Sequence, residues 1–302
     1  MASAGHWCLV LAIWGEKYNG HHVNELARQA RVNSPGLAEI VLFTDRLRDG
    51  IDADIRQTLF PAYFHRPDFF AGAYRAKLAV FSRDFLPRGR PCVFVDLDTV
   101  VTGDLGEIAA LIDSTERCLM MPPAGLGFGA VRRLLDWPRK DKFPVGNSSL
   151  VAFHSDARHN IAEAFQRLHA SSTDVDKLHM VVDDVFISWC HRGRIGGIPK
   201  NLAVSFRREF MARARFILWL RQLVPGRSRR RAGLVAVTLN GMASKPEQLI
   251  SLRDGAVIRG ENGRIGYWSD SYIGPIRQKI IASALRLCAD AAAPPNGTSS
   301  TT

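Results

Sequence analysis

The sequence predicts an α/β protein built on a central, mostly parallel sheet of the Rossmann type with helices on its faces. Short apolar runs of strand length alternate with helical segments through the first hundred residues. The runs are almost continuously apolar, which is typical of strands buried on both faces. The 302 residues are 46% hydrophobic and 23% charged, an ordinary globular composition with ample material for a core.

The first elements follow one another in a regular order. The predicted elements are a strand over Cys8–Ile13, a helix over His22–Ala30, a strand over Glu39–Phe43, a helix over Ala71–Phe85 and a strand over Cys92–Val95. Ligands of parallel sheets bind beyond the carboxyl ends of the strands. We therefore expect Trp14–Tyr18, Thr44-Asp45 and Asp96-Leu97-Asp98 to lie along one edge.

Beyond Asp98 the pattern is coarser. It predicts a short helix over Leu105–Ile112, a Pro/Gly-rich loop over Leu119–Gly129, a strand over Ser149–Phe153, helices over Ala157–His169 and Val182–Cys190, a turn over Arg194–Pro199 and a strand over Leu234–Leu239. The tail from Ala289 is of low complexity and is expected to be disordered.

The cysteines and the amino-terminal residues predict the cellular compartment of the protein. The five cysteines are scattered and odd in number, which argues against a disulfide framework or a zinc site and favours a reducing environment. The apolar run Trp7–Trp14 has no basic stretch before it and is too short to span a bilayer. We expect a cytoplasmic protein, or one held peripherally on the inner face of the membrane.

The positive charge is concentrated in one segment. Of the net charge of +11, residues 207–231 contribute +8, from nine arginines against the single acid Glu209, and the remainder carries +3. No zinc-finger spacing, recognition-helix pattern or aromatic-basic interleaving accompanies the charge, so no nucleic-acid partner is expected. One basic segment on a near-neutral body points to a local anionic surface.

A helix over Phe210–Val224 would be amphipathic. One side would carry the apolar residues Phe210, Phe216, Ile217, Trp219, Leu220, Leu223 and Val224. The opposite side would carry the polar residues Arg208, Arg215, Arg221 and Gln222. Arg213 and Leu218 do not fit this division. Such a helix can lie in a membrane interface, its arginines on anionic headgroups, and the basic linker Pro225–Arg231 would extend that surface. A packed helix with a solvated basic loop explains the charge equally well.

Asp96-Leu97-Asp98 is the candidate metal site. Two carboxylates separated by one residue at the end of a buried strand can approach one Mg²⁺ or Mn²⁺ ion, which prefers oxygen ligands and keeps positions open for phosphate. The metal would act as a Lewis acid on a diphosphate leaving group. The alternative is a pair of solvated aspartates, but the apolar run Val93–Val101 around the tripeptide favours a site.

The stretch Phe69–Leu105 resembles glycosyltransferase family 8 and its bacterial relatives, which have the GT-A fold. The segments that carry the resemblance are, in order, Trp14–Tyr18, Phe43–Asp45, Tyr74–Leu78, Val93–Asp98, Val100–Leu105, Gly146–Ser149, Asp183-Asp184 and Asn240-Gly241 with Lys245-Pro246. The resemblance implies a single GT-A type domain over residues 1–288 with a basic helical elaboration near the C-terminus (207–231). Residues 7–105 would bind nucleotide, 106–250 would complete the donor and acceptor sites, and 289–302 would be a disordered tail.

The resemblance also implies an activity and roles for single residues. A retaining hexosyltransferase would move sugar from a nucleotide-diphospho-sugar, a UDP-sugar foremost, to a glycan or lipid-linked acceptor in polysaccharide or lipopolysaccharide biosynthesis. Asp96 and Asp98 would bind Mn²⁺ or Mg²⁺. The other implied donor-binding residues are Tyr18, which would stack on the base or is simply a loop aromatic, Asp45 near the nucleoside, Lys77 at the diphosphate or donor sugar, and Lys245. Asn147 and Asp184 would be the catalytic residues and would hold donor-sugar hydroxyls.

Departures from the family pattern keep other interpretations open. Asn240 stands where the family has a metal-binding histidine, and would be a weaker oxygen ligand. A serine also replaces the glycine expected after Asn147-Ser148. For Asp183, a helix-start carboxylate is slightly favoured.

Two alternative functions remain. The first is a haloacid-dehalogenase-like phosphatase with Asp96 as nucleophile, Asp98 as general acid and Asp183-Asp184 as a later metal-binding pair. The second, suggested by Asn240, is a protein that binds nucleotide-sugar without catalysis.

Overall fold

The computed structural model describes residues 6–71, 75–123, 128, 143–171, 178–239, 241, 246–259 and 265–292. The chain forms two compact units. The first contains Met1–Ser205 and Gly233–Thr238, and the second contains Phe206–Ala232 and Leu239–Thr302. The single domain expected over residues 1–288 spans both units, and its limits stay a prediction.

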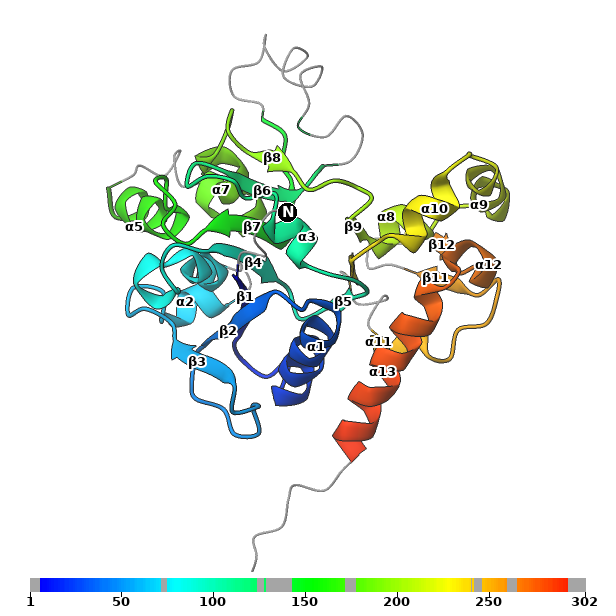
Figure 1. The fold of residues 1–302 in the computed structure, drawn as a ribbon, viewed down its shortest axis with the longest axis horizontal. Coiled ribbons are helices and arrows are strands. Elements are labelled where there is room, and N and C mark those ends of the chain that lie inside the picture. The colour runs from blue at the N-terminus through cyan, green and yellow to red at the C-terminus, as the bar shows by residue number, and fades with distance from the viewer. Residues whose placement is uncertain are drawn as a thin grey trace, which may run out of the picture. The chain divides into compact units, whose positions relative to one another are not determined.

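A seven-stranded sheet forms the centre of the first unit, as far as the chain is described, with the order β3-β2-β1-β4-β7-β6-β8 (Figure 1). Its strands are β1 (Trp7–Ile13), β2 (Leu37–Thr44), β3 (Ile55–Leu59), β4 (Pro91–Val95), β6 (Cys118–Met121), β7 (Asn147–His154) and β8 (Gly196–Gly197). β3, β2, β1 and β4 run parallel, β7 is antiparallel to both β4 and β6, and β8 is parallel to β6. The predicted mostly parallel α/β sheet is confirmed.

Alternate residues of these strands enter two separate hydrophobic cores, because successive side chains of a strand point to opposite faces. Val10 of β1 and Phe94 of β4 belong to a core that includes residues of η1 (Arg75–Phe81), α5 (Ile161–Ser171) and α7 (Asp183–Cys190). Leu9 and Val95 belong to the other core, with residues of α1 (Gly20–Asn33) and α3 (Gly106–Ala109). The unit is a three-layer sandwich, and the sheet is buried on both faces.

The candidate metal site Asp96-Leu97-Asp98 leads directly into the first strand of a second, three-stranded sheet. This sheet has the order β5-β10-β9, with β5 (Thr99–Val101), β9 (Ala203–Ser205) and β10 (Ala236–Thr238). Asp96-Leu97-Asp98 therefore forms the turn between a strand of the large sheet and a strand of the small one. The turn is pinned by two backbone hydrogen bonds, from the Asp96 N–H to the Ser149 carbonyl (2.9 Å) and from the Thr99 N–H to the Asp96 carbonyl (3.0 Å).

The structure corrects two predictions in this unit. The helix predicted over Ala71–Phe85 is two short 3₁₀ helices, η1 and η2 (Arg83–Phe85), separated at Ser82, whose backbone is extended. Tyr74 lies outside the described residues. The loop predicted over Leu119–Gly129 is wrong at its start, since Leu119, Met120 and Met121 belong to the buried strand β6.

The second unit contains the basic segment. Its elements are α8 (Phe206–Phe210), α9 (Arg215–Gln222), α10 (Arg227–Ala232), α11 (Pro246–Leu249), β11 (Val257–Arg259), β12 (Ile265–Tyr267), α12 (Asp270–Ile273) and α13 (Ile276–Ala292). The helix predicted over Phe210–Val224 is thus interrupted between α8 and α9, and the predicted basic linker Pro225–Arg231 is largely the helix α10. Among the described residues no helix is both long enough and apolar enough to cross a membrane.

Candidate functional site

The site lies along one edge of the large sheet. β1, β2 and β4 are parallel, so their carboxyl ends meet there, and antiparallel β7 brings its amino end to the same edge, with Leu150 paired to Val95. Trp14–Tyr18, Asp45, Asp96 and Asn147 each follow or begin one of these strands. The predicted gathering of the strand-end segments at one edge is therefore confirmed.

Lys77 is the centre of a buried charge cluster at this edge. Its ammonium nitrogen lies 3.0 Å from an Asp96 carboxylate oxygen, 3.0 Å from an Asp183 oxygen and 2.9 Å from the Ser148 hydroxyl. The side chain is 7% exposed. The contacts with Asp96 and Ser148 are hydrogen bonds and the contact with Asp183 is an ion pair, so the ammonium is held on three sides.

Ser148 joins the two aspartates of α7 to the sheet. Its hydroxyl donates to Asp183 Oδ2 (2.6 Å), and its backbone N–H donates to Asp184 Oδ1 (2.5 Å). The next N–H, of Ser149, donates to Asn147 Oδ1 (3.0 Å). The two α7 aspartates, predicted as a donor-sugar residue and a helix-start carboxylate, therefore flank Ser148.

The charges of the cluster do not balance. Burial lowers the pKa of Lys77, but the attraction of Asp183, Asp96 and Asp184 outweighs it and raises that pKa above its ordinary value. Burial, opposed by Lys77 and reinforced by repulsion from Asp98 and Asp183, raises the pKa of Asp96 to about 6. Burial and the neighbouring Asp183 also raise the pKa of Asp184. One ammonium among these carboxylates leaves an excess of negative charge, which is the electrostatic requirement of a cation site.

The raised pKa of Asp96 makes a prediction for stability. Its folded pKa of about 6 lies above the roughly 3.9 of an unfolded aspartate. Its contribution to stability is therefore fully present below about pH 4 and is lost as the pH rises through about 6, amounting to at most about 2–3 kcal/mol. Urea unfolding in the presence of a chelator should show the parent losing stability relative to Asp96→Asn across this window. The exposed Asp84, as Asp84→Asn, is the control, and a pH-independent difference between the parent and Asp96→Asn would contradict the assignment.

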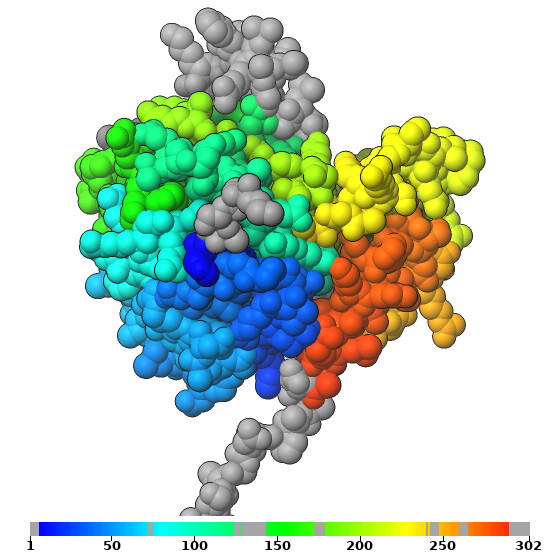
Figure 2. Space-filling model, in the orientation of Figure 1, coloured from blue at the N-terminus to red at the C-terminus, as the bar shows by residue number. Residues whose placement is uncertain are grey.

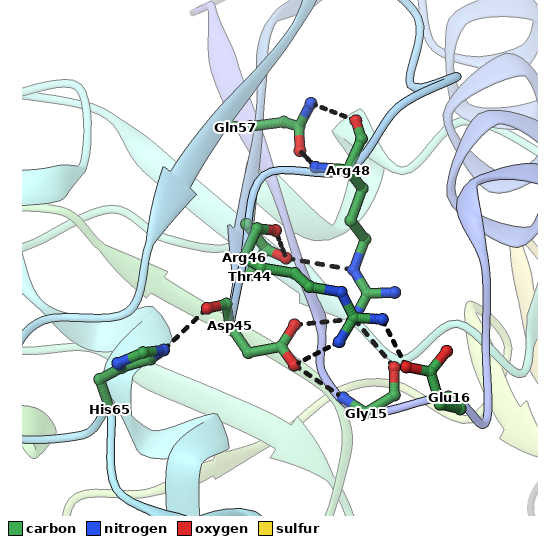
Figure 3. A network of polar contacts seen from close by, with 8 residues as sticks. All are labelled: Gly15, Glu16, Thr44, Asp45, Arg46, Arg48, Gln57 and His65. Carbon is green, nitrogen blue, oxygen red and sulfur yellow. Dashed lines mark hydrogen bonds and ion pairs between the residues drawn. The ribbon is translucent and has the colours of Figure 1, made fainter.

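A second polar cluster surrounds Asp45 at the end of β2 (Figure 3). Gly15 adopts a left-handed conformation, φ +61°, which glycine tolerates without strain. Its N–H donates to Asp45 Oδ2 (3.1 Å), and its carbonyl accepts from Arg48 (2.9 Å). Arg48 also donates to Asp45 Oδ1 (2.7 Å), so the loop after β1 and the loop after β2 are clamped together.

Further contacts fix the same loops. Arg46 bridges Asp45 (3.1 Å) and Glu16 (2.6 Å), and His65 contacts the Asp45 carbonyl (2.7 Å). Burial alone would raise the pKa of Asp45, but the Gly15 N–H and the two arginines lower it below its usual value. The lowered pKa favours an ionised Asp45 carboxylate. Figure 3 shows the contacts through which it joins the loops after β1 and β2.

The other predicted residues are placed as follows. Tyr18 is partly buried, packs edge-on against His22 (ring centroids 5.1 Å apart) and has the Lys17 ammonium 5.3 Å from its ring centroid. Asp98 is partly exposed in the turn after β4. Asn240 and Lys245 lie outside the described residues, so their roles as third metal ligand and donor-binding residue stay predictions.

Sequence reasoning missed the bridging role of Ser148 and the ion pair of Asp183 with Lys77. Asp183 does start a helix, as expected, but it is 4% exposed and bonded to Lys77 and Ser148. A buried lysine needs a carboxylate partner, and Lys77 lies among six consecutive buried residues of η1. In the sequence, the available indication of a distant partner was the apolar run that surrounds this lysine, Ala76-Lys77-Leu78-Ala79-Val80-Phe81.

The donor set at the turn after β4 suits a divalent cation. No group of three or more His, Cys, Asp or Glu side chains that could hold a metal ion occurs in the part of the chain that the structure describes. Mg²⁺ and similar ions, however, are commonly bound by one or two carboxylates together with water and substrate phosphates. Asp96 and Asp98, with the surplus negative charge beside them, fit an ion held jointly by protein and nucleotide.

No protein-family description and no curated protein matches the chain. Solved structures do match. WbbM, a bifunctional glycosyltransferase, is 14% identical with a TM-score of 0.55, over 94% of this chain and 50% of that one. The galactosyltransferase LgtC, solved with donor and acceptor sugar analogues, is 13% identical with a TM-score of 0.52, over 96% of this chain and 98% of that one. The glycosyltransferase GlyE of Streptococcus pneumoniae TIGR4, in its apo form, is 13% identical with a TM-score of 0.52, over 94% and 62%.

The chain therefore has the GT-A type fold of these glycosyltransferases, as the sequence predicted. It spans about half of WbbM, less than two thirds of GlyE and nearly all of LgtC.

Proposed function

We propose that the protein is a metal-dependent glycosyltransferase that moves a hexosyl group from a nucleotide-diphospho-sugar to a glycan or lipid-linked acceptor. The observation that supports this most is the convergence of Asp96, Asp98, Asn147 and Asp184 at one edge of a sheet whose fold is shared with LgtC, which was solved with donor and acceptor sugar analogues. A UDP-sugar is the donor that we favour, with retention of the anomeric configuration, both following the family resemblance.

In this proposal Asp96 and Asp98 hold Mn²⁺ or Mg²⁺. The bound ion would neutralise the diphosphate as it leaves. Lys77, whose ammonium is already held by Asp96, Asp183 and Ser148, would act by fixing the Asp96 and Asp183 carboxylates. The proposal assigns Lys77 this positioning role in place of the contact with the diphosphate or donor sugar that the resemblance implied.

The donor sugar would lie against Asn147 and Asp184. Asn147 Oδ1 and Asp184 Oδ1 are both oriented by backbone N–H groups of β7, which fixes where the remaining polar atoms of these side chains point. Amides and carboxylates suit sugar hydroxyls because they donate and accept in fixed directions. The clamped loops of Gly15 and Asp45, with Tyr18 beside them, would receive the nucleoside.

The test is binding of UDP and Mn²⁺ to the full chain. We expect each alone to stabilise it weakly and the two together to raise the free energy of unfolding by about 2.7 kcal/mol at a hundredfold excess over Kd. Calorimetric titration and thermal unfolding both measure this. Absence of UDP or GDP binding with either Mn²⁺ or Mg²⁺ would sink the proposal.

A donor-hydrolysis assay then separates an enzyme from a protein that only binds nucleotide-sugar. The phosphatase alternative also uses Asp96, but it predicts hydrolysis of phosphate monoesters that does not depend on UDP. The fold shared with WbbM, LgtC and GlyE favours the transferase.

A further inference from the structure

The helix α9 exposes an apolar face. Phe216, Trp219 and Leu220 of the helix form this face together with Leu223 and Val224, which follow its end, and 63%, 59%, 49%, 60% and 50% of their surface is exposed. Leu218 is 4% exposed and anchors the helix. At about 100° per residue, Phe216, Leu220 and Leu223 lie opposite Leu218. The yellow part of the surface in Figure 2 belongs to the stretch of chain that contains α8, α9 and α10. Clustered exposed apolar side chains of this kind mark an interaction site.

The exposed charged side chains of the segment 206–232 are all basic. Arg213, which precedes α9, and Arg229 of α10 are exposed. The one acid of residues 206–232, Glu209, is 10% exposed and is held by Arg227 (3.2 Å) and Arg230 (2.5 Å). It is therefore not available to neutralise the exposed arginines.

Three arginines of the segment make contacts within the second unit. Arg227 and Arg230 bind Glu209, and Arg231 is buried with its guanidinium 4.1 Å from the centre of the Tyr272 ring. These three side chains hold α8, α10 and α12 together. Removing the whole basic run Arg227–Arg231 would therefore damage the unit, and the informative positions are Arg213 and Arg229.

We propose that the apolar face of α9 inserts into the interface of an anionic lipid bilayer, with Arg213 and Arg229 on lipid phosphates. Interfacial helices combine an apolar face with arginines or lysines that contact headgroups. A second copy of this chain is a poorer occupant, because an isologous contact would bring the same arginines face to face. The structure thereby replaces the one long amphipathic helix expected here with a shorter element, and identifies which of the expected apolar side chains are exposed.

The experiment is co-sedimentation of the full chain with vesicles of phosphatidylcholine, with and without phosphatidylglycerol. It is done without nucleotide or metal, so its outcome is independent of the glycosyltransferase proposal. We expect binding to the anionic vesicles. Arg229→Glu should weaken binding at least about fivefold, whereas Arg88→Glu, an exposed arginine of the first unit, should not.

The apolar contribution is tested separately. Trp219→Ser with Leu223→Ser should reduce binding at least tenfold, whereas Leu47→Ser, at a residue 69% exposed in the first unit, should leave it unchanged. Trp219→Phe should keep binding but lose the quenching of tryptophan fluorescence by brominated lipid. Unchanged thermal unfolding of each variant shows that the fold is intact.

Two results would overturn the proposal. One is absence of binding of the parent to anionic vesicles. The other is a parent protein that is dimeric in buffer and does not bind vesicles, together with a Leu223→Ser variant that is monomeric. That result would assign the apolar face to self-association.

Discussion

Lys77→Met is expected to lower the free energy of unfolding by about 3–5 kcal/mol, the cost typical of removing one partner from a buried ion pair. The ammonium contacts Asp96, Asp183 and Ser148, and its loss leaves Asp183, which is 4% exposed, as a buried carboxylate without its counter-ion. Repulsion between Asp96 and Asp183 would then be uncompensated.

Urea unfolding at neutral pH measures this effect. Lys17→Met is the matched control, because Lys17 is exposed, and it should change stability by no more than about 0.5 kcal/mol. Adding Asp183→Asn to Lys77→Met should recover part of the loss, since it removes the orphaned charge. Equal stability of Lys77→Met and Lys17→Met would show that the ion pair contributes nothing.

Asp98→Ala should leave the fold intact and reduce sugar transfer on the order of a thousandfold, because a Lewis acid supplies several kcal/mol of charge stabilisation to a leaving diphosphate. Asp98 is partly exposed in the turn after β4, and the backbone bonds that pin this turn come from Asp96, Thr99 and Ser149. The Mn²⁺-dependent stabilisation by UDP should be lost in parallel.

Thermal unfolding with UDP, with and without Mn²⁺, measures that stabilisation, and a donor-hydrolysis assay follows turnover. Asp84→Ala, at an exposed aspartate away from the strand ends, should behave like the parent. An Asp98→Ala protein that binds UDP and Mn²⁺ as the parent does would remove Asp98 from the metal site.

The sheet and its functional edge could be predicted because both depend on local pattern. Apolar runs of strand length define β1, β2 and β4, and the residues that follow each run lie at the carboxyl edge by geometry alone. The link between Lys77 and Asp183 could not be predicted in this way, because it joins positions on η1 and α7 that only the folded sheet brings together. The same holds for the hydrogen bonds of Gly15 and Arg48 with Asp45.

The basic segment, residues 207–231, shows a different limit of prediction from the sequence. Periodicity alone predicted one helix over Phe210–Val224, but Phe210 of α8 is fully buried and Leu218 of α9 faces the interior. The two residues lie on separate helices joined by Met211–Ala214. The charge pattern of the sequence also does not show which arginines make contacts within the protein. Arg231, for example, lies over the Tyr272 ring.

The position of β10 determines how the chain could be shortened. β10 is the middle strand of the β5-β10-β9 sheet, yet it follows α8–α10 in the sequence. A protein ending at Ser205 would lose the shared partner of β5 and β9, and the N–H groups of Thr102 and Gly103 would lose their acceptor, the Val235 carbonyl. The first unit cannot therefore be separated by truncation. Separation requires an internal deletion that retains Gly233–Thr238 and replaces residues 206–232 by a crossover of about a dozen residues, because β9 and β10 are parallel.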